Sequence, residues 1–194
     1  SNGVVSRCIA TDINAGPLES ARRTLARAGV LDRCELILCD GLAGCQENRA
    51  DTVIIAGMGG DNISGILSRA PWTGTDTLLL LQPMSKAEHL RAWLCENGFE
   101  IISEHLVRDA GKIYPVITAR ACAQSMRLSD AEMVIGRLPQ VAREALFQTF
   151  LDAIIDKYQK AIDAQRSARG DVPRLPGMSK LLDEIKKIRE EYCR

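Results

Sequence analysis

Six short apolar runs alternate with helical patterns over residues 4–120, and this alternation restricts the possible folds more than any other feature. The runs cover residues 4–9, 34–39, 52–56, 77–81, 99–107 and 113–119. Apolar residues at helical spacing fall between them, for example Leu18, Ala21 and Leu25, or Leu90, Trp93 and Leu94. Such alternation predicts a largely parallel α/β sheet with crossover helices. Because the segment 109–112 between the last two runs is too short for a helix, those runs are expected to form an antiparallel hairpin.

The apolar period changes after residue 121. Ser129 and Glu132 have the spacing of a capping box, which predicts a helix that starts there and runs toward Pro139. Two longer helical stripes follow, over residues 147–162 and 178–192, and a segment rich in glycine and proline separates them. We therefore expect an antiparallel helical hairpin and two domains, residues 1–121 and 122–194. Scaffolding or dimerisation is an equally good role for such a hairpin.

Composition excludes several classes of protein. A hydrophobic content of 46% with 26% charged residues argues against disorder, and no apolar run approaches the roughly 18 residues that span a bilayer. The 25 basic and 25 acidic residues cancel, so overall charge does not indicate a nucleic-acid partner. Seven cysteines without a Cys-x-x-Cys pair argue against a metal site. With no signal peptide, these thiols favour a reducing cytoplasm.

Chemistry is expected where the parallel strands end, because ligands of open α/β sheets bind there. Asp12 ends the first run and Asp40 follows the second, so one acid could accept hydrogen bonds from a ribose diol and the other from an adenine amino group. Acids in solvated turns are also common. After the third run, glycine-rich residues 56–60 would let the backbone approach a ligand closely. Asn62 replaces the last glycine of a Gly-x-Gly-x-x-Gly fingerprint, which argues against a dinucleotide site.

Taken together, these strings resemble the bacterial tRNA adenine-N1 methyltransferases. The strings that match in order are residues 12–18, 40–42, 56–60, 81–83 and 111–114. The resemblance covers residues 4–119, and the helical hairpin matches the family's C-terminal coiled coil in kind. It implies a Rossmann-like class I methyltransferase sheet, S-adenosylmethionine as the cofactor, no metal, and adenine 22 of tRNA as the acceptor.

Carried over by position, the resemblance implies two groups of site residues. The cofactor group is Asp12, Ile13, Asp40, Gly41, Ala56, Gly57 and Met58, in which Asp12 would hold the ribose and Asp40 with Gly41 would border the adenine. The group facing the target base is Gln82, Pro83 and Tyr114. Each has a structural alternative: Met58 as core packing, Tyr114 as an interior phenol, and the glycines as a tight turn.

Contacts to tRNA rest on the resemblance as well. Basic residues that could contact phosphates are Arg22, Arg23, Arg27, Lys157, Lys160, Arg166, Arg169 and Arg174. An ordinary charged helix face is the favoured alternative for them. A non-catalytic RNA- or protein-binding module and a methyltransferase with a different acceptor remain the competing functions.

The chain also departs from the family at three points. The family's first strand and acidic glycine-containing loop would precede residue 1, so we expect a fragment that binds the cofactor poorly or not at all. Met84 stands where the family commonly has an asparagine, so an amide able to read the target base is missing there. Pro115 lies just inside the last run, which predicts a bulge or a strand start there.

Overall fold

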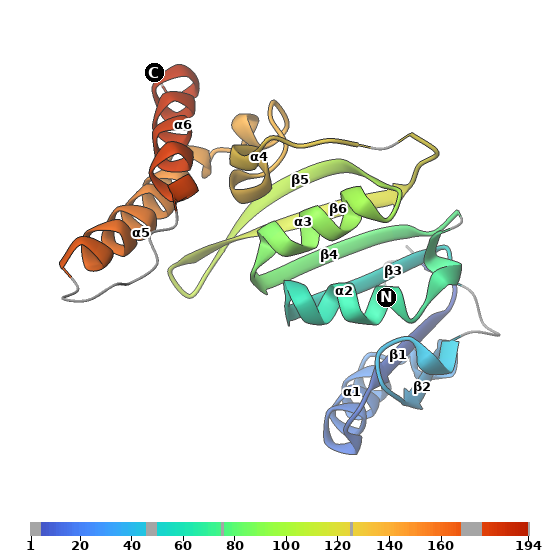
Figure 1. The fold of residues 1–194 in the computed structure, drawn as a ribbon. Helices are drawn as coiled ribbons and strands as arrows, with labels where there is room; N and C mark the ends of the chain where they lie inside the picture. Colours follow the sequence, from blue (N-terminus) through green and yellow to red (C-terminus); the bar gives the residue numbers. More distant parts are fainter. Residues whose placement is uncertain (1–4, 46–49, 75, 125, 168–175, 194) are drawn as a thin grey trace.

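The computed structural model describes residues 5–45, 50–74, 76–124, 126–167 and 176–193 (Figure 1). Its first half alternates strands and helices: β1 (Cys8–Asp12), α1 (Ala15–Arg27), β2 (Cys34–Leu38), β3 (Thr52–Gly59), α2 (Gly60–Ser68), β4 (Leu78–Ser85) and α3 (Ala87–Glu96). The hairpin strands β5 (Phe99–Asp109) and β6 (Lys112–Ala121) follow. Three α-helices complete the described part of the chain: α4 (Asp130–Ile135), α5 (Phe147–Ser167) and α6 (Pro176–Tyr192). The predicted α/β alternation is therefore confirmed.

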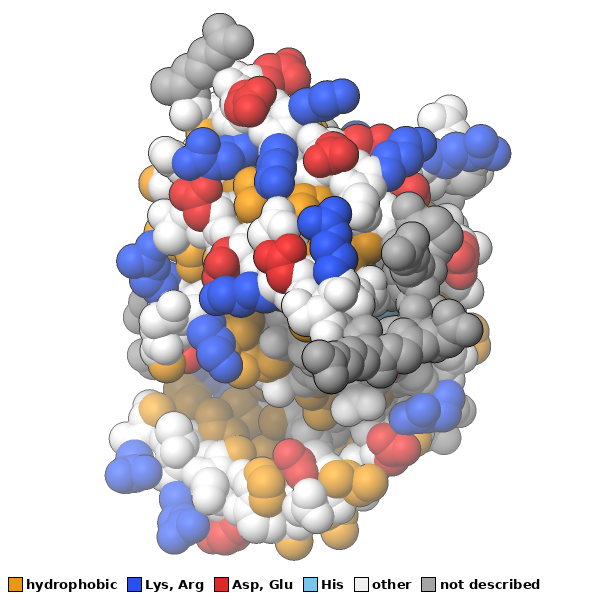
Figure 2. Space-filling view, turned by 60° about the vertical axis from the view of Figure 1, so that its left-hand side comes forward, with side chains coloured by type: hydrophobic (Ala, Val, Ile, Leu, Met, Phe, Trp, Pro, Cys, Tyr) orange, Lys and Arg blue, Asp and Glu red, His pale blue; other side chains and the backbone are white. Residues whose placement is uncertain are grey.

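The strands of the described residues form two sheets. β1 and β2 pair in parallel, and a second sheet has the order β3-β4-β6-β5. β3 and β4 are parallel, whereas β6 runs antiparallel to both β4 and β5, as expected for a final hairpin. β1 and β3 thus each keep one edge without a strand partner in this part of the chain. Figure 2 shows a hollow lined with hydrophobic side chains between the lowest part of the molecule, which α1 and its strands form, and the part above it.

One face of the larger sheet carries the main apolar core. α2 and α3 cover that face (Figure 1), and their residues Ile63 and Leu90 are fully buried together with Leu79 and Ile117 of the sheet. Neighbouring strand residues alternate between the two faces. On the opposite face, Ile54 of β3 remains 69% exposed.

Three sequence predictions need correction at the ends of elements. The first strand begins at Cys8, not near residue 4, because its partner β2 begins opposite it at Cys34. The helix after Ser129 has the predicted capping box but ends at Ile135, well before Pro139, because Gly136 has φ of 103°. Pro115 causes neither a bulge nor a strand start.

The pairing of β6 explains why Pro115 is tolerated. β6 continues through this residue, which pairs with Leu106 of β5, and the ladder with β4 ends at Ile117. The missing N–H of the proline therefore costs no hydrogen bond to β4. The irregular position in the ladder between β5 and β6 lies instead in β5, between Ile101 and Ser103.

The last two helices form the predicted antiparallel hairpin. Asp152 of α5 pairs with Arg189 of α6, and Gln159 accepts a hydrogen bond from Lys186, so the contacts run in opposite directions along the two helices. A second apolar cluster joins this hairpin to α4 and to Leu106 of β5. The helix-breaking segment expected between the helices lies mostly outside the described residues. The domain boundary at residue 121 stays a prediction.

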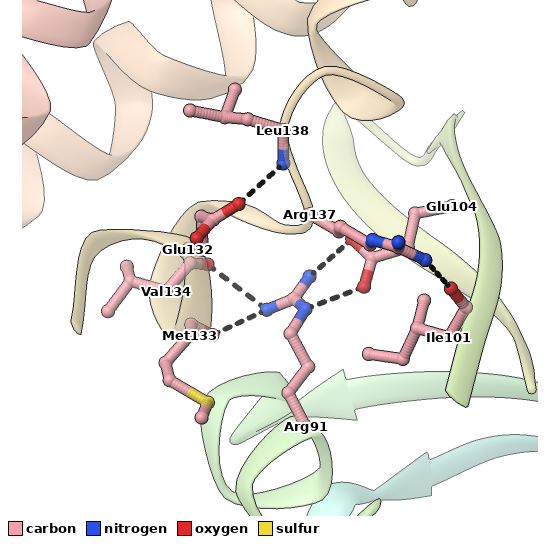
Figure 3. Close-up of polar contacts among 8 residues, drawn as sticks. All are labelled: Arg91, Ile101, Glu104, Glu132, Met133, Val134, Arg137 and Leu138. Atoms are coloured by element: carbon pink, nitrogen blue, oxygen red, sulfur yellow. Dashed lines mark hydrogen bonds and ion pairs between the residues drawn. The ribbon is translucent and has the colours of Figure 1, made fainter. Parts of the chain in front are cut away.

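A buried ion pair links the sheet to the helical part (Figure 3). The side chains of Arg91 on α3 and Glu104 on β5 are both 0% exposed, and Arg91 Nε donates to Glu104 Oε1 at 2.8 Å. Arg91 Nη1 also donates to the carbonyls of Met133 and Val134 in α4, at 2.8 and 3.2 Å. Only glycine fits at position 136 beside this pair, because a Cβ there would lie 2.1 Å from Glu104 Oε2. Arg91 therefore fixes α4 against the sheet.

Candidate functional site

The carboxyl ends of β1 and β2 lie side by side, and hydrogen bonds hold them together. Cys39 N donates to the Asp12 carbonyl at 3.0 Å, and Thr11 Oγ1 donates to the Gly41 carbonyl at 2.7 Å. Gly41 has φ of 58°, and a Cβ there would lie 2.8 Å from Ile66 Cγ2. Glycine is therefore required at this turn. The structure brings the two predicted acids, Asp12 and Asp40, to the same edge.

Each of these carboxylates has one oxygen in use. Asp12 Oδ1 accepts from Asn14 N at 2.8 Å, which orders the turn before α1, and Asp40 Oδ2 accepts from Arg69 at 3.1 Å. Within the described residues, the other oxygen of each acid has no hydrogen-bond partner. Both acids can thus accept further hydrogen bonds from a ligand. Ile13, beside Asp12, is 65% exposed.

At the end of β3 the chain bends at a glycine. The register with β4 is irregular on both sides of Met58, and Gly57 has φ of 77°. Gly57 N donates to Gln82 Oε1 at 2.9 Å, so the side chain of Gln82 holds the bend against β4. Ala56, Gly57 and Met58 are all exposed. With 42% of its surface accessible, Met58 is not a core residue.

Of the three residues predicted to face the target base, Gln82 and Pro83 lie on β4 and Tyr114 lies on β6. Gln82 Nε2 donates to the Pro83 carbonyl at 3.3 Å, and its Oε1 keeps a second lone pair for another donor. Pro83 and Tyr114 line one cleft of about 660 Å³. The end of β4, the β5–β6 hairpin and α5 form the walls of this cleft.

A polar cluster beside the glycine bend was missed from the sequence. Asp61 near the start of α2 accepts hydrogen bonds from Lys86 and, at 2.8 Å, pairs with His89 Nδ1. These bonds, first from Lys86 and then from His89, lower the pKa of Asp61 below its ordinary value of 3.8. Asp61 is not the N-cap of α2, since Gly59 holds that position.

Backbone packing holds the same two loops together. Lys86 has a left-handed backbone with φ of 55°, and a Cβ at Gly60 would lie 2.2 Å from the Lys86 carbonyl oxygen. Asp61 and Lys86 are 25 positions apart, so no local spacing signalled this contact.

The basic residues predicted to contact tRNA phosphates have different surroundings. Lys157 lines the cleft. Several others pair with acids on their own helices: Arg22 with Glu19, Lys160 with Asp156 and Arg166 with Asp163. Arg23 donates to Ser20 and Arg27 to the Arg23 carbonyl. Arg169 and Arg174 lie outside the described residues.

The described ranges contain neither a metal-binding cluster nor a membrane-spanning helix. No group of three or more His, Cys, Asp or Glu side chains there could hold a metal ion. No helix among those residues has the length and apolar character needed to cross a membrane. All seven cysteines are free.

Comparison with known proteins identifies the family. A family model for tRNA (adenine(22)-N(1))-methyltransferase matches residues 1–188. The chain belongs to this family. A curated member from Bacillus subtilis is 33% identical over 147 residues, which cover 74% of this chain and 61% of the relative. A Mycoplasma genitalium relative is 30% identical over 43% of this chain and 37% of its own length. The chain therefore spans less than two thirds of the length of these two curated relatives.

Solved structures of similar proteins agree with the family's fold. A Streptococcus pneumoniae protein in complex with S-adenosyl-L-methionine superposes with a TM-score of 0.81 and 26% identity, over 96% of this chain and 83% of that one. The B. subtilis M1A22 tRNA methyltransferase superposes with a TM-score of 0.73 and 29% identity, over 96% of this chain and 80% of that one. A Streptococcus agalactiae protein of the NADB-Rossmann superfamily superposes with a TM-score of 0.77 and 26% identity, over 95% of this chain and 79% of that one. The expected Rossmann-like methyltransferase fold is thus confirmed.

Proposed function

We propose that this chain is part of an S-adenosylmethionine-dependent enzyme that methylates N1 of adenine 22 in tRNA. Membership of the tRNA (adenine(22)-N(1))-methyltransferase family supports the activity and the substrate. The observation that carries the proposal is the glycine bend at Gly57, whose backbone is exposed and held by Gln82 at 2.9 Å. The helix α2 that follows this bend lies against the turn after β2, through Ile66 at Gly41. β3 pairs with β4, whose Pro83 lines the cleft together with Tyr114.

The residues at the first edge fit an adenosyl group. Asp12 and Asp40 each have a carboxylate oxygen available, and carboxylates are suited to accept from ribose hydroxyls and an exocyclic amine. Gly41 keeps the turn between β2 and the following residues free of a side chain. Ile13 would border the ribose, and Ala56, Gly57 and Met58 would line the methionine end. The bound cofactor supplies an activated methyl group on a sulfonium sulfur.

Alignment is the main task left to the protein. Holding the adenine N1 in line with a methyl carbon lowers the barrier to methyl transfer through proximity and orientation. Positive charge develops on the adenine during transfer, and the carbonyl oxygens of Ala56 and Gly57 with Gln82 Oε1 can stabilise it. No general base is needed, because the N1 lone pair is unprotonated near neutral pH. Pro83 and Tyr114 would confine the base.

The open strand edges bear on cofactor binding. β1 and β3 each lack a partner on one edge within the described residues, and a hollow lies beside them (Figure 2). By the family resemblance, a further strand and its acidic loop would hold the methionyl end of the cofactor there. That residues 1–194 alone bind the cofactor poorly stays a prediction, which calorimetry with S-adenosylmethionine tests.

Transfer of a labelled methyl group tests the activity. Protein from the complete reading frame, incubated with labelled S-adenosylmethionine, should label tRNA but not a protein extract or a pool of small metabolites. Label in either of those pools, with none in tRNA, would favour the alternative of a different acceptor. No label anywhere would favour a non-catalytic binding module. Acting on tRNA, the enzyme would work in the cytoplasm.

A further inference from the structure

The cleft beside the target-base residues concentrates positive charge. Its basic lining residues are Lys86, Arg108, Lys112 and Lys157, and its acidic one is Glu88. The whole chain, by contrast, has 25 basic and 25 acidic residues. The excess of basic side chains is therefore a property of this cleft and not of the protein as a whole.

Three of these cations are not neutralised. Arg108 and Lys112 stand near the tip of the β5–β6 hairpin, and Lys157 stands opposite them on α5; all three are exposed. Among the residues that the structure describes, none of the three has an ion-pair partner, whereas Lys160, three positions along α5, is paired with Asp156. Exposed cations without carboxylate partners are available to an anionic ligand.

Aromatic side chains stand on two walls of the same cleft. Tyr114 comes from β6 and Tyr158 from α5, and both are half-buried. Burial, with a smaller contribution from the charge of Glu88, raises the pKa of the Tyr158 phenol. Tyr158 therefore stays neutral at physiological pH, and an uncharged aromatic ring can stack against an unpaired base.

We propose that this cleft binds the RNA strand next to the target adenine, with phosphates on Arg108, Lys112 and Lys157 and an unpaired base against Tyr158. This inference rests on the proposed function. The N1 atom lies on the pairing edge of adenine, so the target nucleotide must leave its pair before it can react. Such a nucleotide needs new stacking and phosphate contacts, and this cleft offers both beside Pro83 and Tyr114.

RNA fits these observations better than an acidic protein segment does. Acidic segments need cations but gain little from aromatic rings on two walls, whereas single-stranded nucleic acid uses both. The cleft also begins at the loop that would face the target base, which would place a bound strand next to the reaction.

Binding of tRNA at two salt concentrations tests the proposal. Each lost phosphate contact reduces the slope of log affinity against log salt by roughly 0.7–0.9. Between 50 and 200 mM salt, the loss of affinity should thus shrink by about threefold per contact, or about tenfold for the double variant Lys112→Ala with Lys157→Ala. The matched control is Lys180→Ala with Lys187→Ala, which removes two exposed lysines of α6 that do not line the cleft.

Tyr158 provides an independent test. Tyr158→Leu should weaken tRNA binding by about tenfold, because stacking contributes roughly 1–3 kcal/mol per base. Tyr158→Phe keeps the ring and should bind like the unchanged protein. Thermal melting of every variant excludes loss of fold as the cause.

Several outcomes would overturn the inference. They are an unchanged salt dependence in the cleft double variant, an equal effect in the α6 control, or competition by polyglutamate as strong as that by unlabelled tRNA. If cleft variants bind tRNA normally while methyl transfer to tRNA persists, only the cleft assignment fails. If the unchanged protein from the complete reading frame neither binds nor methylates tRNA, the proposed function fails with it.

Discussion

Removing Arg91 should destabilise the fold far more than removing an exposed arginine. Arg91 and Glu104 are 0% exposed, and Arg91 donates to Glu104 at 2.8 and 3.3 Å and to two carbonyls of α4 at 2.8 and 3.2 Å. Arg91→Met leaves a buried carboxylate without its partner. Breaking such a pair costs roughly 3–5 kcal/mol, so we expect the free energy of unfolding to fall by that amount. Urea unfolding followed by circular dichroism measures it.

Two further variants separate this explanation from a general loss of packing. Combining Arg91→Met with Glu104→Leu removes the stranded charge and should regain about half or more of the loss. The two α4 carbonyls remain unsatisfied, at about 1 kcal/mol each, so recovery should be incomplete. Arg7→Met breaks an exposed ion pair with Glu35 and should cost less than about 1 kcal/mol. A loss below about 1 kcal/mol for Arg91→Met, or no recovery in the double variant, would refute the reasoning.

Other variants test the site and its supports. Gly41→Ala places a Cβ 2.8 Å from Ile66 at φ of 58° and should lower unfolding free energy by about 1–3 kcal/mol; an unchanged melting temperature would contradict this. Because the pKa of Asp61 is depressed below 3.8, its charge stabilises the fold above that pH, and this contribution is lost as pH falls through the folded value. Asp61→Asn should therefore narrow the difference between urea midpoints at pH 3 and pH 6, and an equal difference in both proteins would exclude the effect. In protein from the complete reading frame, Asp12→Asn should weaken S-adenosylmethionine binding by about tenfold in calorimetry, whereas Asp32→Asn, away from the site, should not.

The elements were predictable because their signals are local. The capping box at Ser129 and the alternation of strands and helices depend on residues a few positions apart, and both are confirmed. The end of α4 also has a local signal, the glycine at position 136, which the prediction of a helix toward Pro139 did not use. The tolerance of Pro115, by contrast, depends on where the ladder between β4 and β6 stops.

The candidate site was predictable only in part, for the same reason. Fold topology places the ends of parallel strands at one edge, so Asp12 and Asp40 could be grouped from the sequence. The ties of Asp61 to Lys86 and His89 join residues at least 25 positions apart. No spacing rule connects such residues, and their geometry emerges only when the two loops pack.

Nucleoside mass spectrometry of treated tRNA tests the central claim most directly. Protein from the complete reading frame is incubated with S-adenosylmethionine and with one of two transcripts, which carry adenine or guanine at position 22. We expect N1-methyladenosine in the first transcript and none in the second. Equal modification of both transcripts would contradict the assigned position, and N1-methyladenosine in neither would contradict the assigned activity.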